Sequence, residues 1–187
     1  MSNPKQRLAA LLLEKSYIEG EVTLTSGRKS DYYFDCKQTA LHAEGGYLLG
    51  KMLLEMLPLD VQAVAGLTLG ADPLVSAVSV ISHIQGRNVP GCIVRKKSKG
   101  HGTNQYLEGM ANIFPHMQVA VLEDVVTTGG SVLTACEHIA AAGLPIRGVY
   151  CVLDRAEGGR ERLKEAGYEL SALFTREELL RTGQGDH

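Results

Sequence analysis

The side chains with the clearest chemical potential lie in one stretch, residues 119–131. A short apolar run, of the kind that forms a buried strand, leads into two adjacent acids, Glu123 and Asp124. The residues that follow, 127–131, are small and mostly hydroxylated, and an apolar helical pattern comes after them. The sequence therefore predicts a strand, an acid pair, a glycine-rich turn and a helix, in that order.

This unit suits a phosphorylated sugar. The backbone N–H groups of a Thr-Gly turn converge on one point, and the N-terminus of the next helix adds partial positive charge, which favours a phosphate monoester. Ionised Glu123 and Asp124 accept hydrogen bonds from a sugar diol or bind Mg²⁺. A phosphate beside a diol describes a ribose 5-phosphate. The alternative is an acid pair that ends a surface strand before a capped helix.

The turn lacks the Lys of a P-loop and the spaced glycines of a dinucleotide fingerprint. Its order and spacing instead resemble the phosphoribosyl pyrophosphate (PRPP) motif of type I phosphoribosyltransferases. That resemblance names the donor substrate, and leaves the acceptor base open. It implies that these residues bind PRPP: Glu123, Asp124, Val125, Val126, Thr127, Thr128, Gly129, Gly130 and Ser131.

A second stretch, residues 21–36, predicts a hairpin whose second strand carries three consecutive aromatic residues; its part 24–34 carries the resemblance described next. Such a hairpin offers a flat heterocycle a stacking face and backbone donors, although simple packing is the alternative for Tyr33. The stretch resembles the N-terminal signature of orotate phosphoribosyltransferases, where it forms a hood over the pyrimidine. The resemblance implies that Tyr33 and Phe34 contact orotate through their backbone. Thr25, also expected in this site, stands where many members carry a substrate-contacting Lys.

Residues 95–109 carry many cations and glycines and almost nothing to bury. We expect this segment to be mobile when empty and to be ordered as a lid by an anionic ligand; a solvated charged loop is the alternative. Its pattern resembles the lid Arg-Lys-x-x-Lys-x-His of the orotate family. The resemblance implies that the pyrophosphate of PRPP is bound by Arg95, Lys96, Lys99 and His101. It also implies catalytic roles for Lys99 and His101, together with the acid pair Glu123 and Asp124.

Two strand ends complete the expected crevice. Arg155 follows a buried-type strand, and its guanidinium suits a carboxylate; an ion pair with Asp154 or Glu157 is the alternative. In the orotate family an Arg in this context binds the orotate carboxylate, which implies that Arg155 and Thr127 place orotate. The turn at residues 68–73 contacts pyrophosphate in the family. Many members have Lys where Gly70 stands, so backbone N–H groups are expected to serve here.

Composition limits the class of protein. The chain has 187 residues, with 44% hydrophobic and 21% charged residues and a net charge of −2, which favours one globular domain and argues against a general nucleic-acid binder. No apolar run reaches membrane-spanning length, and no signal-peptide pattern begins the chain. The four scattered cysteines suit reduced core thiols in a cytoplasmic protein.

Strands alternate with helices over most of the chain, which predicts an α/β fold with a mainly parallel central sheet flanked by helices. The resemblance implies the type I phosphoribosyltransferase fold in a single domain, 1–187. We expect residues 1–40 to form an N-terminal helix and a small hood, and residues 41–187 to form the α/β core with its lid.

The resemblance covers nearly the whole chain. It implies transfer of ribose 5-phosphate from PRPP to orotate, giving orotidine 5′-monophosphate and pyrophosphate in de novo pyrimidine synthesis. It also implies Mg²⁺ held through the substrate, with Glu123 and Asp124 as possible ligands, and a homodimer whose lid is shared across the interface. Nucleic-acid and membrane partners are not expected. Two alternatives stay open: transfer to another base, which Thr25 and Gly70 allow, and a non-catalytic PRPP-binding regulator.

Overall fold

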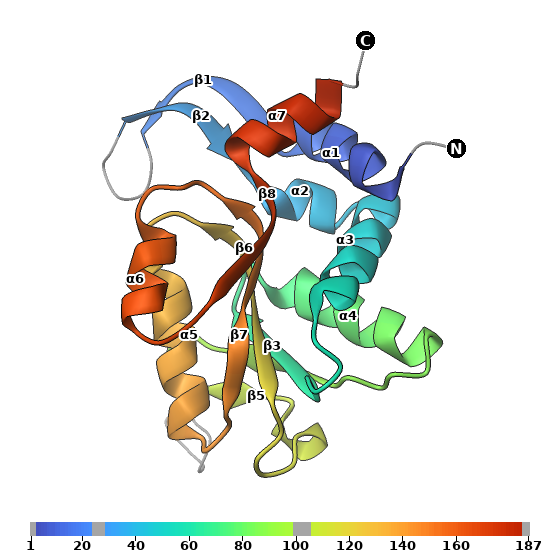
Figure 1. Ribbon diagram of the computed structural model, residues 1–187, viewed down its shortest axis with the longest axis vertical. Coiled ribbons are helices and arrows are strands. Elements are labelled where there is room, and N and C mark those ends of the chain that lie inside the picture. The colour runs from blue at the N-terminus through green and yellow to red at the C-terminus, as the bar shows by residue number, and fades with distance from the viewer. Residues whose placement is uncertain (1–2, 24–28, 99–105, 185–187) are drawn as a thin grey trace.

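The computed structural model describes residues 3–23, 29–98 and 106–184 (Figure 1). The first part of the chain contains α1 (Pro4–Lys15), β1 (Tyr17–Thr23), β2 (Lys29–Phe34), α2 (Cys36–Ala40) and α3 (Ala43–Met56). The middle part contains β3 (Ala63–Leu67), α4 (Asp72–Ile84), β4 (Gly91–Val94), β5 (Leu107–Glu108) and the 3₁₀ helix η1 (Met110–Asn112). The last part contains β6 (Val119–Val126), α5 (Gly130–Ala141), β7 (Ile146–Asp154), α6 (Gly159–Glu165), β8 (Leu170–Thr175) and α7 (Arg176–Gln184).

Six strands form one sheet in the order β5-β4-β3-β6-β7-β8. Neighbouring strands are parallel except β4 and β5, which are antiparallel. The central pair aligns Gly66 of β3 with Leu122 of β6, so the turns after both strands leave the sheet at the same edge. Strands β1 and β2 form a separate antiparallel hairpin above this edge (Figure 1). The predicted α/β fold with a mainly parallel sheet and an N-terminal hairpin is confirmed.

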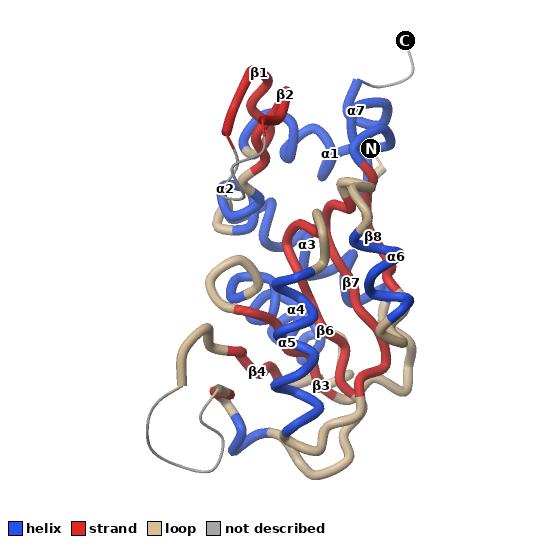
Figure 2. The backbone as a smooth tube through the Cα atoms, turned by 90° about the vertical axis from the view of Figure 1, so that its left-hand side faces the viewer, coloured by secondary structure: helices blue, strands red, loops and turns tan. Residues whose placement is uncertain are grey.

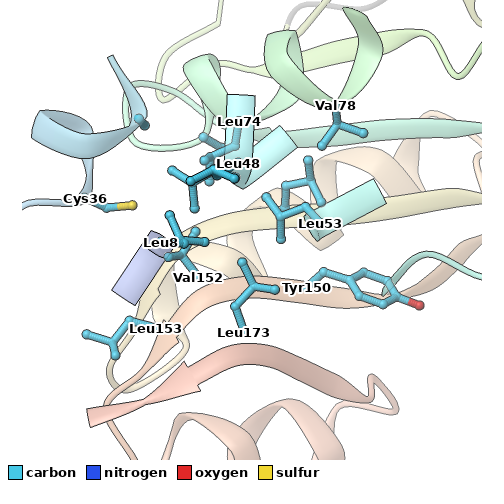
Figure 3. Packing of buried hydrophobic residues seen from close by; sticks show 14 of the residues in the cluster. Leu8, Cys36, Leu48, Leu53, Leu74, Val78, Tyr150, Val152, Leu153 and Leu173 are labelled. Carbon is cyan, nitrogen blue, oxygen red and sulfur yellow. The ribbon is translucent and has the colours of Figure 1, made fainter. Parts of the chain in front are cut away.

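Alternate residues of β6 belong to two hydrophobic cores. Ala120 and Leu122 face the core covered by α1, α3 and α4, whereas Val119 and Val121 face the core under α5 and α6. Figure 3 shows side chains that three helices and two strands contribute to the first core, namely Leu8, Leu48, Leu53, Leu74, Val152 and Leu173. Because both faces are buried, the strands appear in the sequence as continuous apolar runs rather than as an alternating pattern.

The structure differs from the prediction in its short elements and in one strand boundary. The sequence pattern did not predict α2, β5 or η1, because these short elements lack the contiguous apolar run that marks the equally short strands β3 and β4. Strand β6 continues to Val126, so Glu123 and Asp124 lie inside the strand and not after it. This boundary matters because neighbouring residues of a strand point to opposite faces of the sheet.

The cysteines are buried and free, as predicted: Cys36, Cys92, Cys136 and Cys151. Burial raises the pKa of Cys92 to about 11 and that of Cys136 to about 12, so both thiols are uncharged at neutral pH. No helix within the described ranges combines the length and apolar character needed to cross a membrane.

The hairpin is attached to the rest of the chain by a cluster around Tyr32. The rings of Tyr17 and Tyr32 stack with centroids 5.2 Å apart. The guanidinium of Arg176, at the start of α7, lies 4.1 Å from the Tyr32 ring centre and donates hydrogen bonds to Tyr17 Oη (3.1 Å) and Asp31 Oδ2 (2.8 Å). The guanidinium of Arg155, after β7, lies 4.3 Å from the same ring centre. Residues from opposite ends of the chain therefore fix the hairpin together.

Replacing Arg176 tests this attachment. Arg176→Ala removes two hydrogen bonds, one of them charged at both ends, and a cation–π contact, so the hairpin should open more often. We expect hydrogen exchange of the β1 and β2 amides to become about tenfold faster or more, from a loss of roughly 1.5–3 kcal/mol. Arg181→Ala, at an exposed position of the same helix, is the control. Equal protection of the hairpin in both variants would contradict the attachment.

Candidate active site

The acid pair of β6 is divided between two environments. Glu123 is buried, and its Oε2 has no hydrogen-bond partner among the described residues. Asp124 is partly buried; its Oδ1 accepts a hydrogen bond from the Val125 N–H (2.9 Å), and its carboxylate lies against Gly70. The strand geometry thus gives the two carboxyl groups different neighbours although they are adjacent in the chain.

Burial disfavours the charged form of Glu123. It raises the pKa of Glu123 well above its ordinary value, and the nearby charge of Asp124 acts in the same direction. The diol-binding role expected from the sequence requires an ionised carboxylate, so a buried Glu123 suits it poorly. Asp124, which is only partly buried and lies against the turn after β3, is the better candidate for the acceptor of a sugar diol.

The turn after β6 encloses a small cavity of about 90 Å³, lined by Glu123 and residues 125–132. Gly129 adopts a φ of 76°, a left-handed conformation that favours glycine, and directly precedes α5. Gly159 at the start of α6 permits close packing against the turn, since a Cβ there would lie 2.7 Å from the Thr127 carbonyl oxygen. The predicted glycine-rich turn and helix N-terminus are thus present, with space suited to a phosphate group.

The turn after β3 lies beside Asp124. A Cβ on Gly70 would lie 2.6 Å from Asp124 Oδ2, so the turn and the Asp124 carboxylate are in close contact. Thr68 Oγ1 donates a hydrogen bond to Asp72 Oδ2 (2.8 Å), which closes the turn onto the start of α4. Among the described residues no side chain caps this helix. The first-turn N–H groups of α4 are therefore oriented toward the same edge of the sheet as Asp124.

Arg155 is placed at the other end of the crevice. Its side chain is only 6% exposed, its Nε donates a hydrogen bond to Glu157 Oε1 (2.8 Å), and its guanidinium lies over the Tyr32 ring. The ion pair of Arg155 with Glu157, one of the alternatives open from the sequence, is thus present. A guanidinium carries five N–H donors in a planar fork, the kind of group that binds a carboxylate through two parallel hydrogen bonds.

Tyr33 and Phe34, the hood residues expected to contact orotate, differ in exposure because neighbouring residues of a strand point to opposite sides. Tyr33 is 41% exposed, whereas Phe34 is buried in the core. The Phe34 ring is therefore structural, and only its backbone is available to a ligand. Tyr32, which the sequence analysis left without a role, is the ring over which Arg155 and Arg176 lie. No sequence motif marks Arg176, because its partners lie more than a hundred residues away in the chain.

The predicted lid is described only at its two ends. Arg95 Nη1 pairs with Glu108 Oε1 (2.9 Å), and Lys96 is exposed. Lys99 and His101 lie outside the described residues, as does Thr25 of the hood. Their predicted roles are therefore untested.

The carboxyl groups offer a divalent cation few ligands. The described residues contain no group of three or more His, Cys, Asp or Glu side chains suited to a metal ion. Asp124 and the unpartnered Oε2 of Glu123 are hard oxygen donors of the kind Mg²⁺ prefers, and Mg²⁺ usually keeps waters and substrate phosphates as its other ligands. The donor set fits a cation held mainly through a phosphorylated substrate.

Comparisons with known proteins agree with this geometry. Residues 43–168 match the model of the phosphoribosyl transferase domain family. The orotate phosphoribosyltransferase of Nostoc sp. is 46% identical over 94% of this chain and 84% of its own length. A crystal structure of Mycobacterium tuberculosis orotate phosphoribosyltransferase with Fe(III) dicitrate superimposes with a TM-score of 0.82 at 36% identity, covering 95% of this chain and 99% of that one.

A structure of the same mycobacterial enzyme in complex with PRPP has a TM-score of 0.76 at 33% identity and covers 95% of this chain and 99% of that one. With 95% of this chain covered, the similarity extends beyond the matched domain, residues 43–168. The chain has the type I phosphoribosyltransferase fold and belongs to the orotate phosphoribosyltransferase family.

Proposed function

We propose that this enzyme transfers the 5-phosphoribosyl group of PRPP to orotate, giving orotidine 5′-monophosphate and pyrophosphate in pyrimidine biosynthesis. The observation that carries the proposal is the meeting of three features at one edge of the sheet. These are the small cavity of the glycine-rich turn, the partly buried Asp124 beside it, and Arg155 under the hairpin. They suit the 5′-phosphate, the ribose diol and the orotate carboxylate respectively.

The reaction is a displacement at the anomeric carbon. The carbon–oxygen bond to pyrophosphate breaks with its electron pair leaving on oxygen, and a deprotonated ring nitrogen of orotate supplies the pair for the new carbon–nitrogen bond. The chain contributes mainly position and electrostatics. In our assignment the turn at 127–131 holds the 5′-phosphate, Asp124 holds the ribose hydroxyls, and Thr127, Arg155 and the hood hold orotate. Lys96, Lys99, His101 and Arg95 neutralise the leaving pyrophosphate.

Mg²⁺ completes the proposed donor site. When bound, it would neutralise charge on the leaving pyrophosphate, and the residues that would hold it beside the substrate are Asp124 and, once deprotonated, Glu123. The single-domain organisation and a cytoplasmic location remain part of the proposal; the buried, uncharged thiols suit a reducing compartment.

Asp124→Asn tests the donor site. The substitution keeps the size of the side chain but removes its charge, so the grip on the ribose diol and metal should weaken. We expect kcat/KM for PRPP with Mg²⁺ to fall about tenfold or more, from the loss of charge-assisted hydrogen bonds. Asp60→Asn, in an exposed ion pair with Arg147, is the matched control and should leave turnover unchanged. Normal turnover by Asp124→Asn would remove Asp124 from the site.

Arg155→Ala tests the acceptor. Orotate should be preferred over uracil in the wild type because only orotate carries the carboxylate. Losing the guanidinium should reduce that preference by roughly 2–5 kcal/mol, by analogy with truncated charge pairs. Glu157→Gln removes the partner seen in the ligand-free chain and keeps the guanidinium, so it should preserve the preference. An unchanged orotate-to-uracil ratio in Arg155→Ala would return Arg155 to a structural role, and a base panel would then test the alternative acceptors.

We also propose a homodimer in which each lid serves the partner's active site. Exposed apolar side chains on α4 and the turn before it support an interface there, namely Leu69, Val80 and Ile84. Mixing Lys99→Ala with Asp124→Asn under subunit exchange tests it. One site of a mixed dimer would combine an intact lid with an intact acid pair, so part of the wild-type activity should return. Exchange without recovery would place each lid on its own chain.

A further inference from the structure

A larger cavity, of about 580 Å³, opens beside the turn after β3. Its walls come from α2, α3, the turn and the start of α4, and they include Lys37, Leu41, Tyr47, Leu69, Asp72 and Pro73. Within this described lining, Lys37 is the one lysine or arginine. Lys37 of α2, a helix that the sequence pattern did not predict, therefore lines the same cavity as the turn assigned to pyrophosphate.

The turn supplies no cation of its own, because residues 68–73 include no lysine or arginine. A Cβ on Gly70 would lie 2.6–2.7 Å from the three carboxylate atoms of Asp124, so the turn packs closely against the acid assigned to the ribose. Asp72 adds a carboxylate to the same cavity, and a carboxylate repels an anionic ligand. Binding of such a ligand therefore requires a positive charge nearby.

Lys37 is ordered by Asp35. Its Nζ donates a hydrogen bond to Asp35 Oδ1 (2.5 Å), and its side chain is 32% exposed, so it is partly buried. This hydrogen bond raises the pKa of Lys37, and the charges of Asp35 and Asp124 act in the same direction. Lys37 therefore lies within electrostatic reach of Asp124, and its ammonium has three donors, of which Asp35 accepts one in this structure.

We infer that Lys37 is a further binding residue for the diphosphate of the donor substrate, supplied by α2 beside a turn that carries no cation of its own. This inference rests on the proposed function and deepens it. The ammonium would rotate from Asp35 toward the diphosphate, or share its donors between the two, while the backbone N–H groups at the start of α4 approach from the other side. The ligand class is a Mg²⁺-bound diphosphate.

A purely structural role for Lys37 is the competing explanation. The Asp35 side chain accepts a hydrogen bond from the Lys37 backbone N–H (3.2 Å) and thereby caps α2, and the ion pair could simply support that cap. Asp35→Asn separates the two readings, because Asn keeps the cap and weakens the ion pair. If Lys37 binds diphosphate, Asp35→Asn should retain or improve diphosphate binding. If Lys37 only supports the cap, Asp35→Asn and Lys37 variants should behave alike.

The experiment is calorimetric titration of the full chain with inorganic pyrophosphate and Mg²⁺, together with steady-state kinetics. Lys37→Met should weaken pyrophosphate binding and raise the KM for PRPP, each about tenfold or more, with the KM for orotate little changed. Lys37→Arg should recover most of the affinity. Lys51→Met is the matched control, since Lys51 is 30% exposed and pairs with Glu55 on α3. Thermal melting of each variant shows whether the fold is retained.

The outcomes separate this inference from the proposed function. If the wild type converts orotate but Lys37→Met binds pyrophosphate as the wild type does, the role of Lys37 is overturned and the function stands. If orotate is not converted but Lys37→Met weakens pyrophosphate binding and Lys37→Arg restores it, the diphosphate site stands and the acceptor is wrong. The diphosphate site would be overturned if the wild-type chain did not bind pyrophosphate. It would also be overturned if Lys37→Met and Asp35→Asn lost equal amounts of pyrophosphate affinity.

Discussion

The candidate site depends on the close approach of the end of β3 to β6. Gly66 permits this approach, because a Cβ there would lie 2.6 Å from the Leu122 carbonyl oxygen, and Gly70 continues it against Asp124. The parallel register then places both following turns at one edge of the sheet. The proposed diphosphate, ribose and 5′-phosphate positions are adjacent because these two strands are neighbours there. A larger residue at Gly66 would meet the backbone of β6, so this strand contact requires glycine.

The same strand gives two adjacent acids different properties. Glu123 faces the buried side with the glycine-rich turn, and burial holds its pKa well above the ordinary value, whereas Asp124 faces the turn after β3. Separating the protonation behaviour of two neighbouring carboxyl groups by environment is a recurrent way to give them different roles. A cation that approaches Glu123 would favour its ionised form, so ligand binding and the charge of this residue are coupled.

The acceptor side of the site is organised by aromatic and cationic stacking. Tyr32 lies under both Arg155 and Arg176, so the C-terminal helix, the hairpin and the end of β7 are mechanically connected. Arg155 is already ordered by Glu157 and Tyr32 before a ligand arrives. A guanidinium fixed in advance loses less conformational entropy on binding, which favours a planar, bidentate carboxylate contact. Tyr33 remains partly exposed above it, available to an aromatic ring.

Local sequence patterns were enough to predict the order of the main helices and strands, the parallel class of the sheet and the glycine-rich turn. Each of these rests on local periodicity or on a contiguous motif, as in residues 119–131. Three features follow only from the folded chain: Glu123 and Asp124 face different environments, Arg176 fixes the hairpin, and Lys37 lines the cavity beside the turn after β3. The fold brings distant segments together, as with α1 and α7 from opposite ends of the chain, which lie side by side (Figure 2). The three features depend on such long-range contacts and on side-chain direction, which no local pattern encodes.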